Sequence, residues 1–205
     1  MKKIITIGRE FGSGGRELGK QLAEKLGIAY YDNEIVEEIA KKTSLSEKYV
    51  KEILETKPIS VMPAAVGRTF FVPVDYHTNV SLEIFNAQSH VIREMAAKSE
   101  CVIVGRCADY ILKDAEPFRI FVYADMDYKM ARCRARAHEG EDLSDKRLKK
   151  DIMAVDKARA QYYEFYTGQT WGNKLNYDIC VNTTNSEISV VVDALAKMFV
   201  ESQKN

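Results

Sequence analysis

The residues best suited to chemistry lie near the start of the chain, where Gly12-Ser13-Gly14-Gly15 is preceded by Arg9 and followed by Arg16. Successive backbone N–H groups of such a turn point inward, and glycine lets the backbone approach an anion closely. A helix that begins here adds partial positive charge, and arginine donors suit phosphate. The segment predicts phosphate or sulfate binding by the amides of Gly12 to Arg16, with a ligand-free strand-to-helix turn as the alternative.

The strict phosphate-binding-loop pattern, G-x-x-x-x-G-K-[ST], is absent from this segment. Aligned on Gly14, the pattern places its first glycine at Arg9. Its lysine then falls on Gly15 and its Ser/Thr on Arg16. In that pattern the lysine reaches the outer phosphates and the hydroxyl binds magnesium. Arg16 is the predicted source of replacement charge, and Lys20 lies one helical turn further along.

Further candidates lie in the middle and the second half of the chain. Arg106 follows the apolar run 101–104, so we expect its side chain to project into a cleft and bind a phosphate. A structural salt bridge is the alternative for Arg106. Asp156 and Arg159 are three residues apart and share one helix face. This pair is expected either to bind a ribose hydroxyl or base edge, or to form an intrahelical ion pair.

Two more sets have weaker signals. Arg132 and Arg136 are four residues apart on a basic helix and share one face, for which a solvated surface is the alternative. Asp32 and Asp109 are the carboxylates considered for magnesium, because that ion keeps several waters and takes one or two carboxylates. The aromatic residues 162–166, with Trp171, fit a packed core better than a base-stacking site.

These side chains need elements that bring them together. Short apolar runs predict five strands, at 4–7, 28–31, 101–104, 119–123 and 178–182. Helical spacing or charge pattern predicts helices ending at Gly27 and over 34–42, 46–55, 80–98, 128–138 and 188–202, with one long helix or two over 144–166 and a long loop at 57–75. Alternating strands and helices indicate an α/β fold with a five-stranded parallel sheet covered on both faces. Ligands of such sheets bind beyond the carboxyl ends of the strands, where the candidates fall.

Composition narrows the class of protein. The chain has 205 residues, 46% of them hydrophobic, which suits one α/β domain with a small insertion. It carries 30 basic and 30 acidic residues, so the basic excess typical of nucleic-acid and membrane-surface binders is missing. No run approaches the length of a membrane helix. The four cysteines lack C-x-x-C spacing, which predicts free thiols and a cytoplasmic protein.

At this point the chain resembles the cytidylate kinase-like family, a branch of the nucleoside monophosphate kinases. The opening segment 4–17 looks like that family's first motif, and 102–106 looks like its central strand and arginine. The segment 119–124 resembles the strand before the lid, and 176–183 the final strand. Asp156-x-x-Arg159 matches a pair that holds the nucleoside monophosphate in cytidylate kinases.

The resemblance implies a single three-layer α/β/α P-loop kinase domain over 1–205, with a helical acceptor-binding insertion at 33–98 and a lid at 128–172. It implies ATP, magnesium, and CMP or dCMP as acceptor. Arg16, Arg106, Arg132 and Arg136 are then the catalytic candidates, the last two on a lid that closes over the phosphoryl group. The acceptor-binding candidates are Asp32, Arg106, Asp156 and Arg159.

Two other hypotheses stay open because the pattern's lysine is missing. One is a nucleotide- or anion-binding module that derives from the kinase fold and has little or no turnover. The other is a kinase for an unrelated small molecule, or a phosphate-ester binder, on the same fold. In each case the predicted partner is a nucleotide or another small molecule that carries phosphate.

Overall fold

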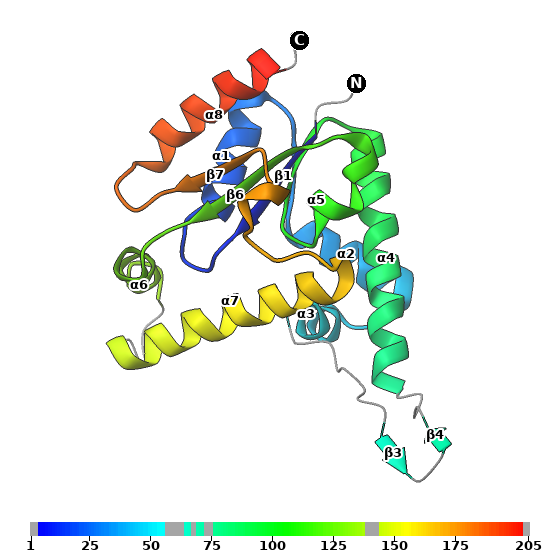
Figure 1. Cartoon of the computed structure of the whole chain (residues 1–205). Helices are drawn as coiled ribbons and strands as arrows, with labels where there is room; N and C mark the ends of the chain where they lie inside the picture. Colours follow the sequence, from blue (N-terminus) through cyan, green and yellow to red (C-terminus); the bar gives the residue numbers. More distant parts are fainter. Residues whose placement is uncertain (1–3, 56–63, 67–68, 72–75, 138–143, 203–205) are drawn as a thin grey trace.

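The computed structural model describes residues 4–55, 64–66, 69–71, 76–137 and 144–202 (Figure 1). Its main sheet has five parallel strands in the order β2-β5-β1-β6-β7. The strands are β1 (Ile4–Arg9), β2 (Ala29–Tyr31), β5 (Cys101–Val104), β6 (Phe118–Tyr123) and β7 (Ile179–Asn182). The predicted parallel sheet is confirmed; β5 has the predicted limits, and the limits of the other four strands differ by one or two residues.

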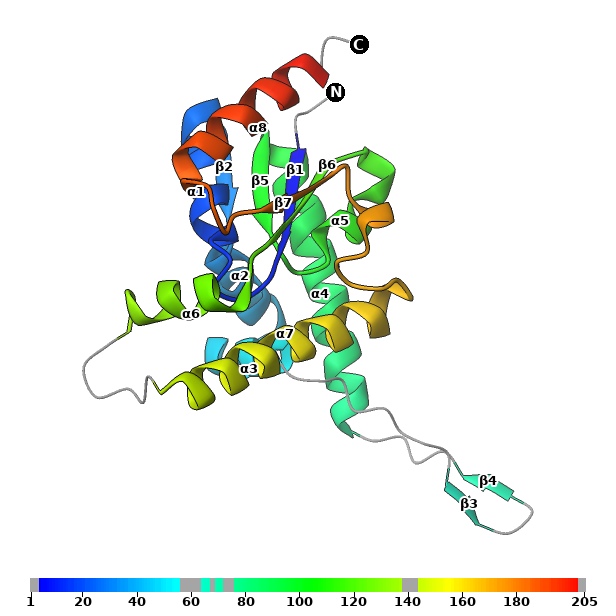
Figure 2. The same ribbon diagram turned by 60° about the vertical axis from the view of Figure 1, so that its left-hand side comes forward.

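Helices cover both faces of this sheet, as Figures 1 and 2 show. On one face lie α1 (Gly15–Leu26) and α8 (Ile188–Ser202). The other face is covered by α2 (Asn33–Thr43), α4 (Tyr76–Lys98) and the short α5 (Ala108–Ile111), with α3 (Glu47–Glu55) packed beside them. Helices α6 (Met126–Arg134) and α7 (Asp145–Thr167) complete the chain. The three-layer α/β/α arrangement is confirmed.

Two apolar cores lie on the two sides of the sheet, because successive side chains of a strand point to opposite faces. On β1, Ile5 and Ile7 are buried with α1 and α8, whereas Ile4 is buried with α2 and α4. Local signals set the helix limits. Gly27 ends α1 in the left-handed conformation with φ of 66°, and the Ser46 hydroxyl accepts from the Tyr49 N–H at 3.3 Å at the start of α3.

The segment predicted as a long loop at 57–75 is partly different. It contains a two-stranded antiparallel sheet of β3 (Ala64–Val66) and β4 (Thr69–Phe71), and the rest of it lies outside the described residues. The prolines and low charge of this segment favoured a loop, and two three-residue strands are too short for alternation to reveal. Helix α4 also begins earlier than predicted, and α6 ends earlier, at Arg134.

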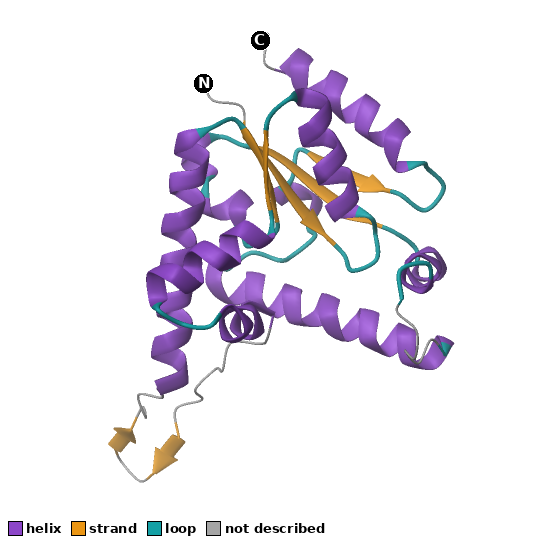
Figure 3. Cartoon of the chain, turned by 180° about the vertical axis from the view of Figure 1, so that it is seen from behind, coloured by secondary structure: helices purple, strands orange, loops and turns teal. Residues whose placement is uncertain are grey.

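The arrangement that matters for function lies at the carboxyl edge of the sheet. In Figure 3, which shows the molecule from behind, α7 runs below this edge and α6, seen end-on, lies to the right of it. The turn between β1 and α1 therefore faces α6 and α7, and the end of β5 lies beside the end of β1. In the part of the chain that the structure describes, no helix has both the length and the apolar character that crossing a membrane requires.

Candidate functional site

The glycine-rich turn between β1 and α1 has the conformation of an open loop. Gly12 and Gly14 have φ of 77° and 85°, which L side chains rarely adopt, and Gly14 is the residue before α1. The Phe11 N–H donates to Asp156 Oδ1 at 2.6 Å, so α7 fixes the start of the turn. The Thr183 hydroxyl donates to the Ser13 carbonyl at 2.7 Å and fixes its middle. The start and the middle of the turn are thus held by residues from distant parts of the chain.

Four of the five predicted amides remain available for a ligand. Among the described residues, no hydrogen bond engages the N–H groups of Gly12, Gly14, Gly15 or Arg16, and these four residues line a cavity. Ser13 differs from the prediction. Its N–H and its hydroxyl both donate to the Glu10 carbonyl, at 3.4 and 2.8 Å, and the residue is fully buried. Ser13 shapes the turn from within instead of facing the cavity.

The arginines near the turn are held by carboxylates. Arg16 Nε lies 2.6 Å from Asp32 Oδ2, and the Asp32 side chain is buried. Arg132 and Arg136 both contact Glu17 Oε2, the first through Nη2 at 2.6 Å. Burial opposes this arrangement, but hydrogen bonds from the two arginines outweigh it and lower the pKa of Glu17. The structure brings Arg132 and Arg136 together at Glu17, at the start of α1. The predicted shared helix face is not found, because α6 ends at Arg134 and Arg136 lies beyond it.

A buried ion network lies beneath the turn. Lys129 Nζ lies 3.0 Å from Glu10 Oε2 and 3.0 Å from Asp156 Oδ2, and only 7% of the Lys129 side chain is exposed. Burial acts against the ammonium, but the two carboxylates raise the pKa of Lys129 above its usual value. Asp156 thus links α7 to both α6 and the turn. Arg159 Nη1 lies 3.9 Å from Asp156 Oδ1, so the intrahelical pair exists but is long.

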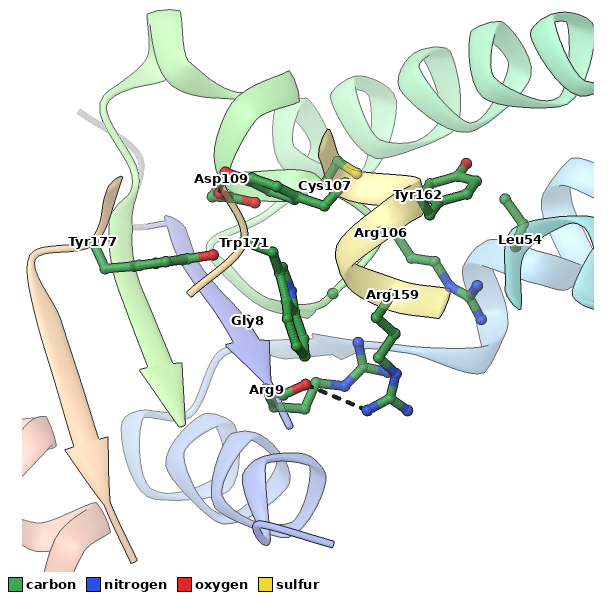
Figure 4. A pocket seen from close by; sticks show the side chains of 12 residues that line it. Gly8, Arg9, Leu54, Arg106, Cys107, Asp109, Arg159, Tyr162, Trp171 and Tyr177 are labelled. Carbon is green, nitrogen blue, oxygen red and sulfur yellow. Dashed lines mark hydrogen bonds between the residues drawn. The ribbon is translucent and has the colours of Figure 1, made fainter. Parts of the chain in front are cut away.

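The end of β5 is strained. Gly105, Arg106 and Cys107 have successive φ values of 72°, 59° and 54°, which non-glycine residues rarely adopt. The Gly105 N–H donates to the Ile7 carbonyl at 2.8 Å, and the fully buried Gln88 donates through Nε2 to the Arg106 carbonyl at 3.0 Å. Strain of this kind persists where the surroundings hold it, often at functional sites. Here it directs Arg106 into a pocket (Figure 4).

Two cavities meet at the ends of β1 and β5. The inner one, of about 50 Å³, is lined by arginines and aromatic rings; its lining includes Arg9, Arg106, Arg159, Tyr162, Trp171 and Tyr177. The outer one, of about 550 Å³, is lined by the turn, α3, α6 and α7. Arg9 and Arg159 line both cavities. Figure 4 shows Arg9, Arg106 and Arg159 reaching the inner pocket from β1, the end of β5 and α7.

The charges of these three arginines are close enough to affect one another. Burial, followed by the like charges of Arg159 and Arg106, lowers the pKa of Arg9 to about 9. The Arg9 carbonyl accepts from Arg159 Nη1 at 3.3 Å. Such a group of cations is stabilised by an anion, so the junction of the two cavities is suited to phosphate or carboxylate.

The two carboxylates considered for magnesium lie in different surroundings. Asp109 is buried in the inner pocket and accepts from the Tyr163 hydroxyl at 2.6 Å; burial raises its pKa. Asp32 holds Arg16 through one oxygen, while its buried Oδ1 has no hydrogen-bond partner among the described residues. Within the described ranges, no group of three or more His, Cys, Asp or Glu side chains could hold a metal. Magnesium that is held mainly by phosphates and water needs only one or two carboxylates, and of the two candidates Asp32 is the one with an oxygen left unpartnered by the described residues.

Several site residues have no signal in the sequence. Lys129 lies in the predicted basic helix and looks like one of its solvated charges, and Gln88 looks like an ordinary helix residue. Their roles depend on which element packs against them. Arg9 was expected only to flank the turn, and its place between two cavities follows from the direction of its side chain. The aromatic residues of α7 were expected in the core; Tyr162 and Tyr163 are buried there and also line the inner pocket.

Comparison with known proteins agrees with this architecture. No curated protein matches the chain. Among solved structures, an uncharacterized protein from Eubacterium ventriosum is 30% identical, with 97% of this chain and 98% of that chain covered and a TM-score of 0.69. Shikimate kinase from Bacteroides thetaiotaomicron is 16% identical, with 97% and 98% covered and a TM-score of 0.57. Shikimate kinase from Acinetobacter baumannii, in complex with shikimate, is 14% identical, with 100% and 96% covered and a TM-score of 0.53.

The two shikimate kinases share the fold with this chain, and at these identities the likeness shows the fold alone. The sequence itself gives a closer assignment, because residues 4–185 match the family model described as the cytidylate kinase-like family. That match includes the glycine-rich turn, the end of β5, and helices α6 and α7, which together form the site. This chain, with its P-loop kinase fold, belongs to the cytidylate kinase-like family.

Proposed function

We propose that this protein is a kinase that transfers the terminal phosphoryl group of ATP to a small acceptor with an anionic group, CMP and dCMP being the first candidates. The observation that carries the proposal is the junction of the two cavities. The available amides of the turn line the outer cavity, Arg106 lines the inner one, and Arg9 and Arg159 line both. Phosphoryl transfer needs positioning and charge neutralisation more than covalent chemistry by the protein.

Each group has a distinct role in this proposal. The amides of Gly12, Gly14, Gly15 and Arg16 bind the donor phosphates. Arg106 binds the anionic group of the acceptor in the inner cavity, whose volume of about 50 Å³ is too small for a whole nucleotide. The rest of the acceptor then lies in the outer cavity, beside Arg159.

The helical regions complete the site. We assign residues 33–98 to acceptor binding, since Lys51 of α3 lines the outer cavity, and residues 128–172 to the lid. On the lid, Arg132 and Arg136 lie beside the turn, with Glu17 as their partner before the donor binds. The donor nucleoside is assigned to a groove of about 490 Å³ that Arg132 also lines, between α1, α6 and the segment 184–189.

Magnesium accompanies the donor in this proposal. Bound with ATP, it neutralises charge on the phosphate oxygens. Asp32 supplies the one protein carboxylate, through the oxygen that Arg16 leaves unused. Asp156 holds the turn in place through Phe11, so it acts as a positioning residue, while Arg159 remains the acceptor contact.

The test is ADP release with a panel of acceptors: CMP, dCMP, UMP, AMP and shikimate. We expect one acceptor to raise the rate above that with ATP alone. Arg106→Gln should then raise the KM for that acceptor by about tenfold or more, since a hydrogen bond to a charged group is worth about 1.5–3 kcal/mol. Arg93 lies on the exposed part of α4, outside both cavities, so Arg93→Gln should leave the KM for that acceptor unchanged. Equal ADP release with and without every acceptor would refute the proposal.

A second candidate function is a nucleotide-binding module without turnover. It is favoured by the carboxylates Asp32 and Glu17, which already pair with Arg16, Arg132 and Arg136. Calorimetry should then show ATP binding while no acceptor increases ADP release. The acceptor panel separates the two functions directly.

A further inference from the structure

The position of the missing lysine is filled by the side chain of Arg9. Gly15 stands where the strict loop pattern has lysine, and Arg9 stands where that pattern has its first glycine. Relative to the pattern, the glycine and the cation have therefore exchanged positions in this chain.

These two positions touch in the structure. A Cβ atom added to Gly15 would lie 2.5 Å from Arg9 Cβ, 3.1 Å from Arg9 Cγ and 3.3 Å from Val122 Cβ. Arg9 Cβ belongs to a paired residue of β1, in register with Val122 of β6, so it cannot move aside as the end of a side chain would. Gly15 consequently has no room for any side chain while Arg9 is present.

A second glycine, Gly105, leaves space for the guanidinium end of the Arg9 side chain. A Cβ atom added to Gly105 would lie 1.9 Å from Arg9 Nη1, and Gly105 has φ of 72°. The guanidinium thus passes between the turn and the end of β5 and reaches the wall that the two cavities share. This is the place where a donor phosphate on the turn faces an acceptor in the inner cavity.

The other arginines of the outer cavity already have partners. Arg16 pairs with Asp32, Arg132 and Arg136 with Glu17, and Arg159 with the Arg9 carbonyl. For the Arg9 guanidinium, the described part of the chain shows no hydrogen bond and no ion pair. The attraction of Asp32 is smaller than the repulsion by Arg159 and Arg106. Arg9 therefore gains most from an added anion.

We propose that Arg9 is the phosphate-binding cation of this protein, in place of the lysine of the strict loop pattern, and that Gly15 and Gly105 are glycines because they admit its side chain. This inference rests on the proposed function, since ATP is taken as the ligand of the turn. It also explains why the pattern's lysine is absent without requiring loss of the phosphate site.

The first test is ATP binding by calorimetry, with adenosine as the probe that lacks phosphates. Arg9→Gln keeps Cβ and Cγ over Gly15 but removes the charge. We expect it to weaken ATP binding about 10- to 100-fold and to leave adenosine binding unchanged. Without ligand its melting temperature should be equal to or above that of the wild type, because crowding among the arginines is relieved. Arg93→Gln is the matched control. If Arg9→Gln binds ATP as tightly as the wild type, the proposal is overturned, whether or not acceptor binding is weakened.

The second test exchanges the two residues. Gly15→Lys alone should lower the melting temperature and ATP affinity, because the lysine Cβ meets Arg9. Arg9→Gly/Gly15→Lys restores the strict pattern at both positions and should bind ATP within about tenfold of the wild type, more tightly than Arg9→Gly alone. The proposal is contradicted if Gly15→Lys keeps the stability and ATP affinity of the wild type. It is also contradicted if Arg9→Gly/Gly15→Lys folds but binds ATP no more tightly than Arg9→Gly. If the exchanged protein does not fold, Arg9→Gln decides.

Failure of the proposed function gives a different result. A wild-type protein that binds ATP through Arg9 but phosphorylates no acceptor refutes the kinase assignment alone. A wild-type protein that phosphorylates an acceptor, with Arg9→Gln binding ATP equally well, refutes the role of Arg9 alone.

Discussion

Asp156→Ala is predicted to destabilise the whole fold, because this carboxylate joins three elements. Its Oδ1 accepts from the Phe11 N–H at 2.6 Å, and its Oδ2 lies 3.0 Å from Lys129 Nζ. A hydrogen bond to a charged group contributes about 1.5–3 kcal/mol. Lys129 keeps Glu10 as a partner, and the exposed fractions of the three side chains, 7%, 27% and 16%, screen the interaction partly. We therefore expect a loss of about 3 kcal/mol in unfolding free energy, below the sum of the two bonds.

The assay is thermal and urea unfolding of the purified chain. For a domain of this size, 1 kcal/mol shifts the melting temperature by about 2–4 °C, so Asp156→Ala should melt about 6–12 °C lower. Asp156→Asn keeps an acceptor for Phe11 and should lose less. The control is Asp193→Ala on α8, whose partner Lys25 lies 2.7 Å away in an exposed pair. Exposed pairs of this kind add little to stability, so Asp193→Ala should melt close to the wild type.

The alternative role for Asp156 was contact with a ribose hydroxyl or base edge. If Asp156→Ala unfolds within about 1 kcal/mol of Asp193→Ala and loses acceptor binding, the structural role is refuted and the ligand role is supported. Loss of stability that Asp156→Asn partly recovers supports the structural role.

Three further predictions concern charge and backbone. The pKa of Glu17 is lowered in the folded protein, so its contribution to stability is present above the unfolded pKa of about 4.3 and is lost as pH falls through the folded pKa. Glu17→Gln should therefore melt at a lower temperature than the wild type at pH 7 and at the same temperature near pH 3. An equal difference in melting temperature at both pH values would contradict this. Burial raises the pKa of Asp109, so the wild type should lose stability as pH rises from about 3.9 through the raised pKa. Asp109→Asn keeps an acceptor for the Tyr163 hydroxyl and should not show this loss. If the melting temperatures of the wild type and Asp109→Asn change in parallel with pH, the buried charge is not the cause. Gly105→Ala and Gly168→Ala both place alanine at a positive φ, 72° and 67°, but only Gly105 faces Arg9. Only Gly105→Ala should therefore weaken ATP binding, as measured by calorimetry. Equal ATP affinities of the two variants would show that Arg9 is not displaced.

Local patterns were sufficient for the architecture. The five strands, the glycine-rich turn and the end of α1 at Gly27 follow from runs of neighbouring residues, because strand formation, φ > 0 and helix termination depend on the nearby chain. The parallel order then places Arg9, Asp32 and Arg106 at one edge of the sheet, which topology alone requires. The hairpin of β3 and β4 was missed because its strands are too short to show a period.

The partners of the charged side chains depended on the tertiary structure. Lys129 and Arg132 lie on the same helix with similar neighbours in sequence, yet one is buried between two carboxylates and the other holds Glu17. The contact between Arg9 and Gly15, and the one between Gln88 and the Arg106 carbonyl, likewise depend on packing. The backbone that could bind an anion was predictable from adjacent residues alone, because its turns and positive φ angles are local properties of the chain. Which cation serves that backbone was decided only by the tertiary structure, because side chains from distant segments compete for the same space and charge.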